Sequence, residues 1–178
     1  MRIIGGQFKG RKFIPPAKNW PTRPTTDYAK EALFNILANR IDLVETVALD
    51  LFGGTGNHCY ELISRGSSDV TYVDQHHGCY RFAKKICAEL NLGEQLKIYR
   101  MDVFKFIKST GKKFDYIFAD PPYAMKQLGT LPDFVFQKEL LNEDGLFVLE
   151  HDNQNDFNDH PRFTETRKYG KSIFTFFE

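Results

Sequence analysis

The sequence predicts an α/β fold with helices on both faces of a mainly parallel sheet. From Val47 onward, short apolar runs alternate with segments whose apolar residues recur at helical spacing. This alternation is typical of parallel strands joined by helices. The last two apolar runs follow each other directly, so an antiparallel pair is expected at one edge of the sheet.

We expect strands over residues 47–52, 69–74, 96–102, 114–119 and 145–150, then an antiparallel pair over 163–169 and 172–177. The helices between them are expected over residues 56–66, 78–91, 103–109 and 130–141. An earlier helix has its N-cap within Thr25-Thr26-Asp27 and ends near Arg40. Before it, residues 2–4 and 12–14 are short apolar segments that we expect to pair as a small hairpin.

The composition indicates one compact domain with a basic extension. The chain has 178 residues, of which 42% are hydrophobic, enough for a single core. Residues 1–30 contain seven Lys and Arg and one Asp, a net charge of +6, whereas residues 31–178 contain 17 Lys and Arg and 22 Asp and Glu. We therefore divide the chain into a basic N-terminal arm over 1–30, suited to a polyanionic partner, and a main domain over 31–178. The alternative is an arm that only adds solubility.

The sequence also favours a cytoplasmic location. No stretch approaches the ~18 apolar residues of a membrane span, and the N-terminus lacks the apolar run of a signal peptide. Cys59, Cys79 and Cys87 form no Cys-x-x-Cys pair, and the five histidines show no metal-ligand spacing. We expect a monomer with reduced thiols, no metal and no membrane association.

A glycine loop follows the first expected strand, in the sequence Asp-Leu-Phe-Gly-Gly-Thr-Gly over 50–56. Glycines let a backbone turn tightly and approach a ligand closely. The dinucleotide fingerprint needs a third glycine where Cys59 stands, which disfavours a nicotinamide-dependent oxidoreductase. S-adenosylmethionine has no phosphate and fits such a loop better, although an ordinary tight turn is the alternative. The candidate cofactor contacts here are Asp50, Phe52, Gly53, Gly54 and Gly56.

The next two expected strands each end in a carboxylate. Asp74, followed by Gln75, ends the second strand, where an acidic side chain can accept both ribose hydroxyls. Asp102 ends the third strand and could accept the adenine amino group, with the Val103 N–H directed at the ring. Each carboxylate alone could be a helix cap. Three successive strands that end with a suitable group indicate a nucleoside site.

The fourth expected strand ends in Asp120-Pro121-Pro122-Tyr123, the most specific motif in the chain. Prolines fix the backbone and remove N–H donors, so their carbonyls remain as acceptors. The Asp120 carboxylate and the Pro121 carbonyl can accept the two N–H bonds of an exocyclic amine, which directs its lone pair at a methyl donor. Tyr123 could stack on the base, which must be unpaired or flipped to enter. Asp120 is also expected to border the cofactor.

These motifs resemble the class I S-adenosylmethionine-dependent methyltransferases, and nearly the whole chain is similar to the RsmD family of bacterial small-subunit ribosomal RNA guanine-N2 methyltransferases. Similar segments include Arg2–Lys12, Arg23–Asp27, Lys30–Leu37, Glu61–Gly66, Glu150–Asp152 and Tyr169-Gly170. The N-terminal segments make this resemblance specific to the family.

The resemblance implies a Rossmann-like fold with a seven-stranded sheet, S-adenosylmethionine as methyl donor, and a guanine in the assembled or assembling small subunit as target. It also implies that the arm over 1–30 contacts RNA, with candidate cations Arg2, Lys9, Arg11, Lys12, Arg23 and Lys30. The chain departs from the family pattern at Tyr28, where an arginine is usual, at Gly53, where alanine is common, and at Asp74, where glutamate is usual. The segment 57–60 replaces a more apolar run.

Three other functions remain open at this point. Asp-Pro-Pro-Tyr also occurs in adenine-N6 methyltransferases acting on RNA or DNA, and the motif itself does not distinguish the two amines. Glutamine-N5 methyltransferases share the chemistry but usually begin the motif with Asn, so Asp120 disfavours them. A non-catalytic RNA-binding protein with this fold is disfavoured by the intact motif.

Overall fold

The computed structural model describes residues 1–15 and 25–178. Seven strands are present in the described residues: β1 (Val47–Leu51), β2 (Asp69–Val73), β3 (Leu96–Tyr99), β4 (Phe114–Ala119), β5 (Leu141–His151), β6 (Phe163–Tyr169) and β7 (Ser172–Phe177). They form one sheet in the order β3-β2-β1-β4-β5-β7-β6. Strands β1 to β5 pair in parallel, and β7 pairs antiparallel with both β5 and β6. The predicted seven-stranded α/β fold is confirmed.

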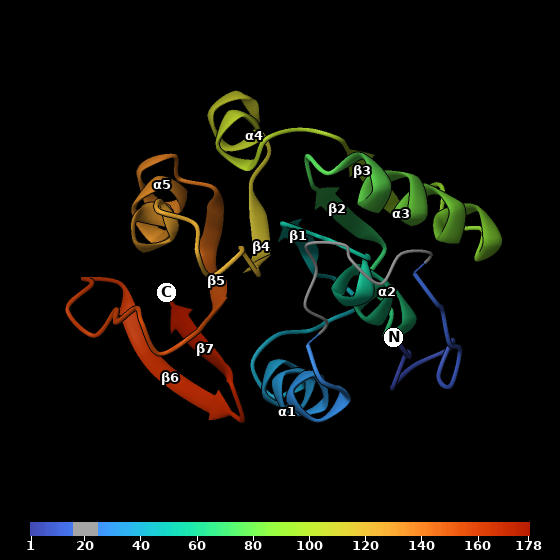
Figure 1. Cartoon of the computed structure of the whole chain (residues 1–178), viewed down its shortest axis with the longest axis horizontal. Helices are drawn as coiled ribbons and strands as arrows, with labels where there is room; N and C mark the ends of the chain where they lie inside the picture. The colour runs from blue at the N-terminus through green and yellow to red at the C-terminus, as the bar shows by residue number, and fades with distance from the viewer. Residues whose placement is uncertain (16–24) are drawn as a thin grey trace.

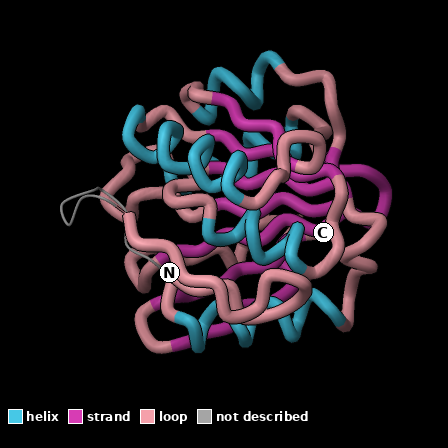
Figure 2. Tube along the Cα trace, turned by 90° about the vertical axis from the view of Figure 1, so that its right-hand side faces the viewer, coloured by secondary structure: helices cyan, strands magenta, loops and turns pink. Residues whose placement is uncertain are grey.

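Helices cover both faces of this sheet (Figure 1). They are α1 (Asp27–Ala38), α2 (Asn57–Ser64), α3 (His77–Glu89), α4 (Val103–Ser109) and α5 (Leu131–Gln137), with a short 3-10 turn over Leu128–Thr130. Helices α1, α2 and α3 share one apolar cluster with the sheet, and α4 and α5 share a second cluster on the other face. Figure 2 shows the strands running side by side behind a layer of helices. In the described part of the chain, no helix is long and apolar enough to span a membrane.

The order of the strands creates a switch point between β1 and β4. The chain proceeds from β1 to β2 and β3 on one side, then returns to place β4 on the other side of β1. Leu51 lies level with Val73 in β2 and with Ala119 in β4, so the three strands end at the same edge. The loops that follow β1 and β4 therefore diverge to opposite faces, which leaves a crevice between them.

Several element boundaries differ from those expected. The helix expected over 130–141 ends at Gln137, because Glu139 takes a left-handed conformation (φ +49°) and β5 already begins at Leu141. The strand expected over 96–102 ends at Tyr99. The expected hairpin over 2–4 and 12–14 is reduced to a single antiparallel bridge between Arg2 and Lys12.

A buried carboxylate on α2 fastens the N-terminal loop to the domain. Glu61 is fully buried, and its two oxygens accept the backbone N–H groups of Ile4 and Gly5 at 2.9 and 2.8 Å. The same carboxylate lies 3.1 Å from the Lys30 ammonium and 2.9 Å from Arg65 Nε. These four donors therefore replace the hydration that the Glu61 carboxylate loses when it is buried.

The arm and the main domain are consequently packed together. Ile3 and Phe13 belong to the same apolar cluster as α1 and α2. The division proposed after residue 30 falls inside α1, whose residues Ala29 and Leu33 are also in that cluster.

We predict that Glu61→Ala will lower the free energy of unfolding by about 3–5 kcal/mol, because it leaves the Lys30 ammonium buried without its partner. Glu89→Ala is the matched control, since Glu89 forms an exposed i,i+4 pair with Lys85 at 3.6 Å. That control should change stability by about 0.5 kcal/mol or less. Urea unfolding of both variants measures the difference, and equal losses would contradict the role given to Glu61.

Candidate active site

A cavity of about 850 Å³ opens at the carboxyl ends of the central strands, at the switch point of the sheet. Parallel sheets commonly bind ligands at this position. It brings together nearly all of the predicted cofactor and target-base residues: Asp50, Phe52, Gly53, Gly54, Asp74, Gln75, Asp102, Val103, Asp120, Pro121, Pro122 and Tyr123. Gly56 is outside the set of lining residues.

The glycine loop after β1 is held against β2. The Tyr72 hydroxyl donates to the Gly54 carbonyl at 2.8 Å, and a Cβ atom on Gly53 would lie 2.3 Å from the Tyr72 ring. Gly56 has φ +78° and caps α2, and a Cβ atom there would lie 2.4 Å from the Tyr60 hydroxyl. Gly56 thus sets the path of the loop, whereas Gly53 and Gly54 face the cavity.

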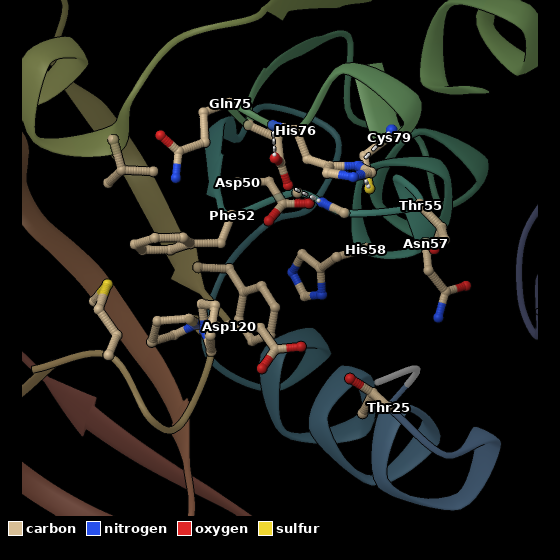
Figure 3. A pocket seen from close by; sticks show the side chains of 18 of the residues that line it. Thr25, Asp50, Phe52, Thr55, Asn57, His58, Gln75, His76, Cys79 and Asp120 are labelled. Atoms are coloured by element: carbon tan, nitrogen blue, oxygen red, sulfur yellow. Dashed lines mark hydrogen bonds between the residues drawn. The ribbon is translucent and has the colours of Figure 1, made fainter. Parts of the chain in front are cut away.

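Asp74 fixes the loop from the end of β2. Its Oδ2 accepts the Gly54 N–H at 2.9 Å, and its Oδ1 accepts the His76 N–H at 2.7 Å. Each carboxylate oxygen has more than one acceptor site, so the side chain can still accept hydroxyl groups from a ligand. Gln75, His76 and Asp74 all line the cavity. Figure 3 shows His76 and Gln75 on the same side of the cavity as Asp50.

Asp102 combines the two interpretations considered from the sequence. It caps α4, because its Oδ1 accepts the Lys105 N–H at 3.0 Å, and it also lines the cavity together with Val103. The cap uses Oδ1, so Oδ2 is not engaged by the helix N-terminus. A helix cap and a ligand contact are therefore compatible at this position.

Asp50 is the most buried of these carboxyl groups. It is 1% exposed, and Cys59 Sγ lies 3.1 Å from its Oδ2. Burial raises the pKa of Asp50 to about 7, because the charged form loses its hydration, while the Cys59 hydrogen bond acts in the opposite direction. The third glycine of a dinucleotide fingerprint is thus replaced by a thiol that contacts a cavity carboxyl.

The Asp120–Tyr123 segment closes the other side of the cavity. Asp120 follows β4 directly, and its backbone N–H donates to the Leu51 carbonyl at 3.3 Å. The Pro122 carbonyl accepts the Met125 N–H at 2.8 Å, and the Tyr123 hydroxyl donates to Glu150 Oε1 at 3.3 Å. The four residues line the same cavity as Asp50 and Asp74, and Figure 3 shows Asp120 across the cavity from Asp50.

Sequence reasoning missed His58, which lies between Asp50 and Asp120 in Figure 3. Its ring stacks on Phe118 with centroids 3.9 Å apart, and its Nε2 lies 3.0 Å from the Tyr116 hydroxyl. Burial lowers the pKa of His58 well below its ordinary value, so the ring is neutral. Its place in the first turn of the helix that follows the glycine loop was the available signal.

Glu150 and Thr25 were also missed. Glu150 ends the apolar run of β5 just as Asp74 and Asp102 follow theirs, so the same strand-end argument would have found it. Thr25 lines the cavity and donates to Glu150 Oε2 at 2.8 Å. His151, the next residue after Glu150, is 2% exposed and contacts Thr175 Oγ1 through Nε2 at 2.7 Å.

The predicted RNA-contacting cations occupy different environments. Lys9, Arg11 and Lys12 are exposed on the N-terminal loop. Arg2 is paired with Asp27 at 3.0 Å, and both side chains are close to half exposed. Arg23 lies outside the described residues.

Lys30 requires a correction. It is 2% exposed, and its ammonium donates to the Arg2 carbonyl at 2.6 Å and to Asn57 Oδ1 at 2.9 Å, besides its ion pair with Glu61. All three of its N–H bonds have acceptors, so it is unavailable to a phosphate at the surface. Lys30 instead joins the N-terminal loop to the edge of the cavity, which it also lines.

The described residues contain no group of three or more His, Cys, Asp and Glu side chains that could hold a metal ion. The sheet order, the glycine loop after β1, the carboxylates after β2 and β3, and Asp-Pro-Pro-Tyr after β4 together define a class I methyltransferase fold. The family model described as conserved hypothetical protein 95 matches residues 1–178. The chain belongs to this family, and its resemblance to the RsmD family is confirmed.

The similar proteins are methyltransferases or proteins of the same fold. A putative rRNA methyltransferase, YlbH, of Bacillus subtilis is 34% identical over 86% of this chain and 84% of its own length. Ribosomal RNA small subunit methyltransferase D of Escherichia coli is 30% identical over 87% and 76%. A hypothetical protein of Thermus thermophilus superposes with a TM-score of 0.85 at 29% identity, covering 100% and 99%. The putative methyltransferase SMU.776, solved with SAH, shares the fold at 18% identity, with a TM-score of 0.67 over 84% and 49%.

We predict that Asp50→Asn will change how stability depends on pH. The folded pKa of about 7 lies above the value of about 3.9 for an unfolded Asp, so between these values only the unfolded chain loses the proton. This carboxyl therefore contributes stability that is complete below about pH 4 and is lost as the pH rises through 7. Asn cannot ionise, so the variant should gain stability relative to the parent across this interval.

Urea unfolding at a series of pH values measures this effect. Asp159→Asn, at an exposed position, removes one carboxyl away from the cavity and serves as the control. Parallel stability curves for the parent and Asp50→Asn would contradict the assignment.

Proposed function

We propose that this protein transfers a methyl group from S-adenosylmethionine to the exocyclic N2 amine of a guanine in small-subunit ribosomal RNA. The observation that carries the proposal is the entry of Asp120–Tyr123 into the same cavity as Asp50, Asp74 and Asp102. The names of the relatives support ribosomal RNA as the substrate, since they include small subunit methyltransferase D. A cytoplasmic, monomeric enzyme acting on an assembled or assembling small subunit fits this substrate.

The residues around the cavity fit S-adenosylmethionine. The backbone of Gly53 and Gly54 lets a ligand lie close to the loop, and Asp74 keeps acceptor capacity for ribose hydroxyls. Asp102 and Val103 adjoin the cavity where an adenine would need an acceptor and a donor. The Asp50 carboxylate can accept hydrogen bonds from the cofactor's ammonium group, since it is the buried carboxyl nearest the glycine loop along the chain. The SAH bound to the related fold of SMU.776 supports the same cofactor class.

The bound cofactor supplies an electrophilic methyl group on a sulfonium. The chain must then place an amine whose lone pair is delocalised into the base. Asp120 and the Pro121 carbonyl accept its two N–H bonds, and Tyr123 stacks on the ring, so the lone pair is aimed at the methyl carbon. As the nitrogen–carbon bond forms and the sulfur–carbon bond breaks, Asp120 stabilises the positive charge on nitrogen. The methylated nitrogen then releases one proton to Asp120 or to water.

We predict that two substitutions will separate chemistry from cofactor binding. Asp120→Ala should lower methyl transfer at least about 100-fold, as expected when a positioning and charge-stabilising group is removed, and leave cofactor affinity within about threefold. Asp74→Ala should weaken cofactor binding about tenfold or more, because the ribose loses its acceptor. Asp74→Asn keeps an acceptor for Gly54 and serves as the control for loop distortion.

The assay uses labelled S-adenosylmethionine and small subunits lacking the modification, followed by identification of the labelled nucleoside by mass spectrometry. N2-methylguanosine supports the proposal. N6-methyladenosine would keep the mechanism but replace the substrate, and near-normal turnover by Asp120→Ala would refute the mechanism. A protein without catalytic function would show no transfer and no cofactor binding.

We also predict that the exposed cations of the N-terminal loop contact RNA phosphates. Replacing Lys9, Arg11 and Lys12 with Ala should weaken binding and lower the slope of log K against log salt by about 0.7 for each phosphate that the loop no longer neutralises. The control replaces Lys108, Lys113 and Lys138, three exposed lysines at or near α4 and α5 on the other face of the sheet. Equal salt slopes for the two triple variants would exclude the loop from the RNA interface.

A further inference from the structure

The end of β5 carries a buried carboxylate that bridges two residues of the cavity. Glu150 is 2% exposed, and its Oε1 accepts the Tyr123 hydroxyl at 3.3 Å while its Oε2 accepts the Thr25 hydroxyl at 2.8 Å. Tyr123 and Thr25 both line the cavity, whereas Glu150 is outside the set of lining residues. Glu150 therefore acts on the site through its partners.

The position of Glu150 is fixed by the sheet. Its strand pairs with β4 on one side and with β7 on the other, and Glu150 lies level with Phe174 of β7. The neighbouring pair Leu149 and Ala119 places Glu150 beside the start of the Asp120–Tyr123 segment. Because hydrogen bonds to both neighbouring strands fix the β5 backbone, the Glu150 carboxylate has little freedom to move. The hydrogen-bonded Tyr123 and Thr25 side chains are therefore positioned by Glu150.

A hydrogen bond at the tip of a tyrosine constrains the whole ring. The phenolic oxygen lies on the axis of the second side-chain torsion, so fixing it together with the Cα atom sets the direction of the ring axis. The phenolic O–H bond prefers the plane of the ring, so its direction toward the acceptor also restrains rotation of the ring about that axis. A bond to a buried carboxylate is stronger than one between neutral groups, since charge assistance and low dielectric both increase its strength. Phenylalanine at this position would keep the aromatic face but lose this orientation.

We propose that Glu150 is a positioning residue for the target base: it holds the Tyr123 ring in the position and orientation at which the base stacks, and it ties that ring to Thr25, just before α1. The inference rests on the proposed function, because it assigns Tyr123 to the base. Thr25 and Tyr123 are 98 residues apart in the chain and share one carboxylate. The segment that precedes α1 is thereby coupled to the loop that presents the amine's acceptors.

A purely structural carboxylate would behave differently. Removing it would lower the free energy of unfolding and leave the turnover of the folded fraction unchanged. Removing a positioning group should lower kcat for RNA at a given folded fraction, because the bound base is misaligned, and should leave cofactor affinity unchanged. The two roles therefore separate in a kinetic measurement corrected for folded protein.

The test is a double-mutant cycle on kcat with saturating S-adenosylmethionine and small subunits as substrate. We expect Tyr123→Phe and Glu150→Gln each to lower kcat about tenfold or more, since the first removes the hydrogen bond and the second removes the charge that strengthens it. The double variant should be no slower than the slower single variant, because the charge of Glu150 acts on the ring only through the Tyr123 hydroxyl. The dissociation constant of the cofactor should stay within about twofold in all three.

The matched control is Glu61→Gln, which alters another buried carboxylate, bonded to Ile4 and Lys30 rather than to Tyr123. Combined with Tyr123→Phe, its effect on kcat should be multiplicative. If Glu150→Gln fails to fold, Thr25→Val and Thr25→Ser test the same bridge from its other end. Val should lower kcat, and Ser, which keeps the hydroxyl, should restore it.

Multiplicative effects of Tyr123→Phe and Glu150→Gln, or an unchanged kcat in Glu150→Gln, would overturn the inference. An unchanged kcat in Thr25→Val would likewise remove Thr25 from the bridge. Asp120→Ala, assayed in parallel, distinguishes the two levels of the argument. If Asp120→Ala is inactive and the cycle is multiplicative, the proposed function stands and only the positioning role fails. If Asp120→Ala keeps near-normal turnover, the proposed mechanism fails, and if the parent protein yields no N2-methylguanosine, the proposed function itself fails.

Discussion

The pairing of β1 with both β2 and β4 is the constraint on which the site depends. Because all three strands are parallel and end at the same level, their following loops leave the sheet at one edge. The loop after β1 enters α2 on one face, whereas the segment after β4 leads to α5 on the other. The cavity is the space between these diverging loops. A different strand order would scatter the same residues along the edge.

Three buried carboxyl groups lie in or next to the cavity, and the hydration that each loses on burial is compensated in a different way. Glu61 and Glu150 are surrounded by donors: backbone N–H groups and cations for Glu61, hydroxyl groups for Glu150. Asp50 has a weak thiol donor and a raised pKa. This difference fits the proposed function, in which Asp50 binds the positive charge of the cofactor and therefore cannot be fully hydrogen-bonded within the protein.

Much of the site could be predicted because its polar residues lie at or near the ends of apolar strand segments, which are recognisable in the sequence. Asp74, Asp102 and Asp120 were found where expected strands end, and Asp50 was found from the glycine loop that follows it; the structure brings all four to one cavity. The positions that sequence reasoning missed are set by long-range packing. Lys30 looked like one more cation of a basic arm, and only the fold shows it buried beside Glu61.

The same distinction explains the errors in the fold. Helix α5 ends without a glycine or proline, because Glu139 adopts a left-handed conformation where β5 must join the sheet. The N-terminal segments form a single bridge, since the backbone N–H groups of Ile4 and Gly5 bond to Glu61 on α2. In both places a distant partner outweighs the local pattern, and a single sequence does not reveal that partner.

The segment from Thr25 into the first turn of α1 connects the two sides of the cavity. Thr25, just before α1, reaches Glu150 and through it Tyr123, while Lys30, within α1, reaches Asn57 at the start of α2. Lys30 is also bonded to the N-terminal loop, directly through the Arg2 carbonyl and indirectly through Glu61. This segment is thus bonded to the loop that carries the exposed cations, to the start of α2 on one side of the cavity and, through Glu150, to Tyr123 on the other. A polyanion held by the N-terminal loop would therefore act on an element that already touches both halves of the site.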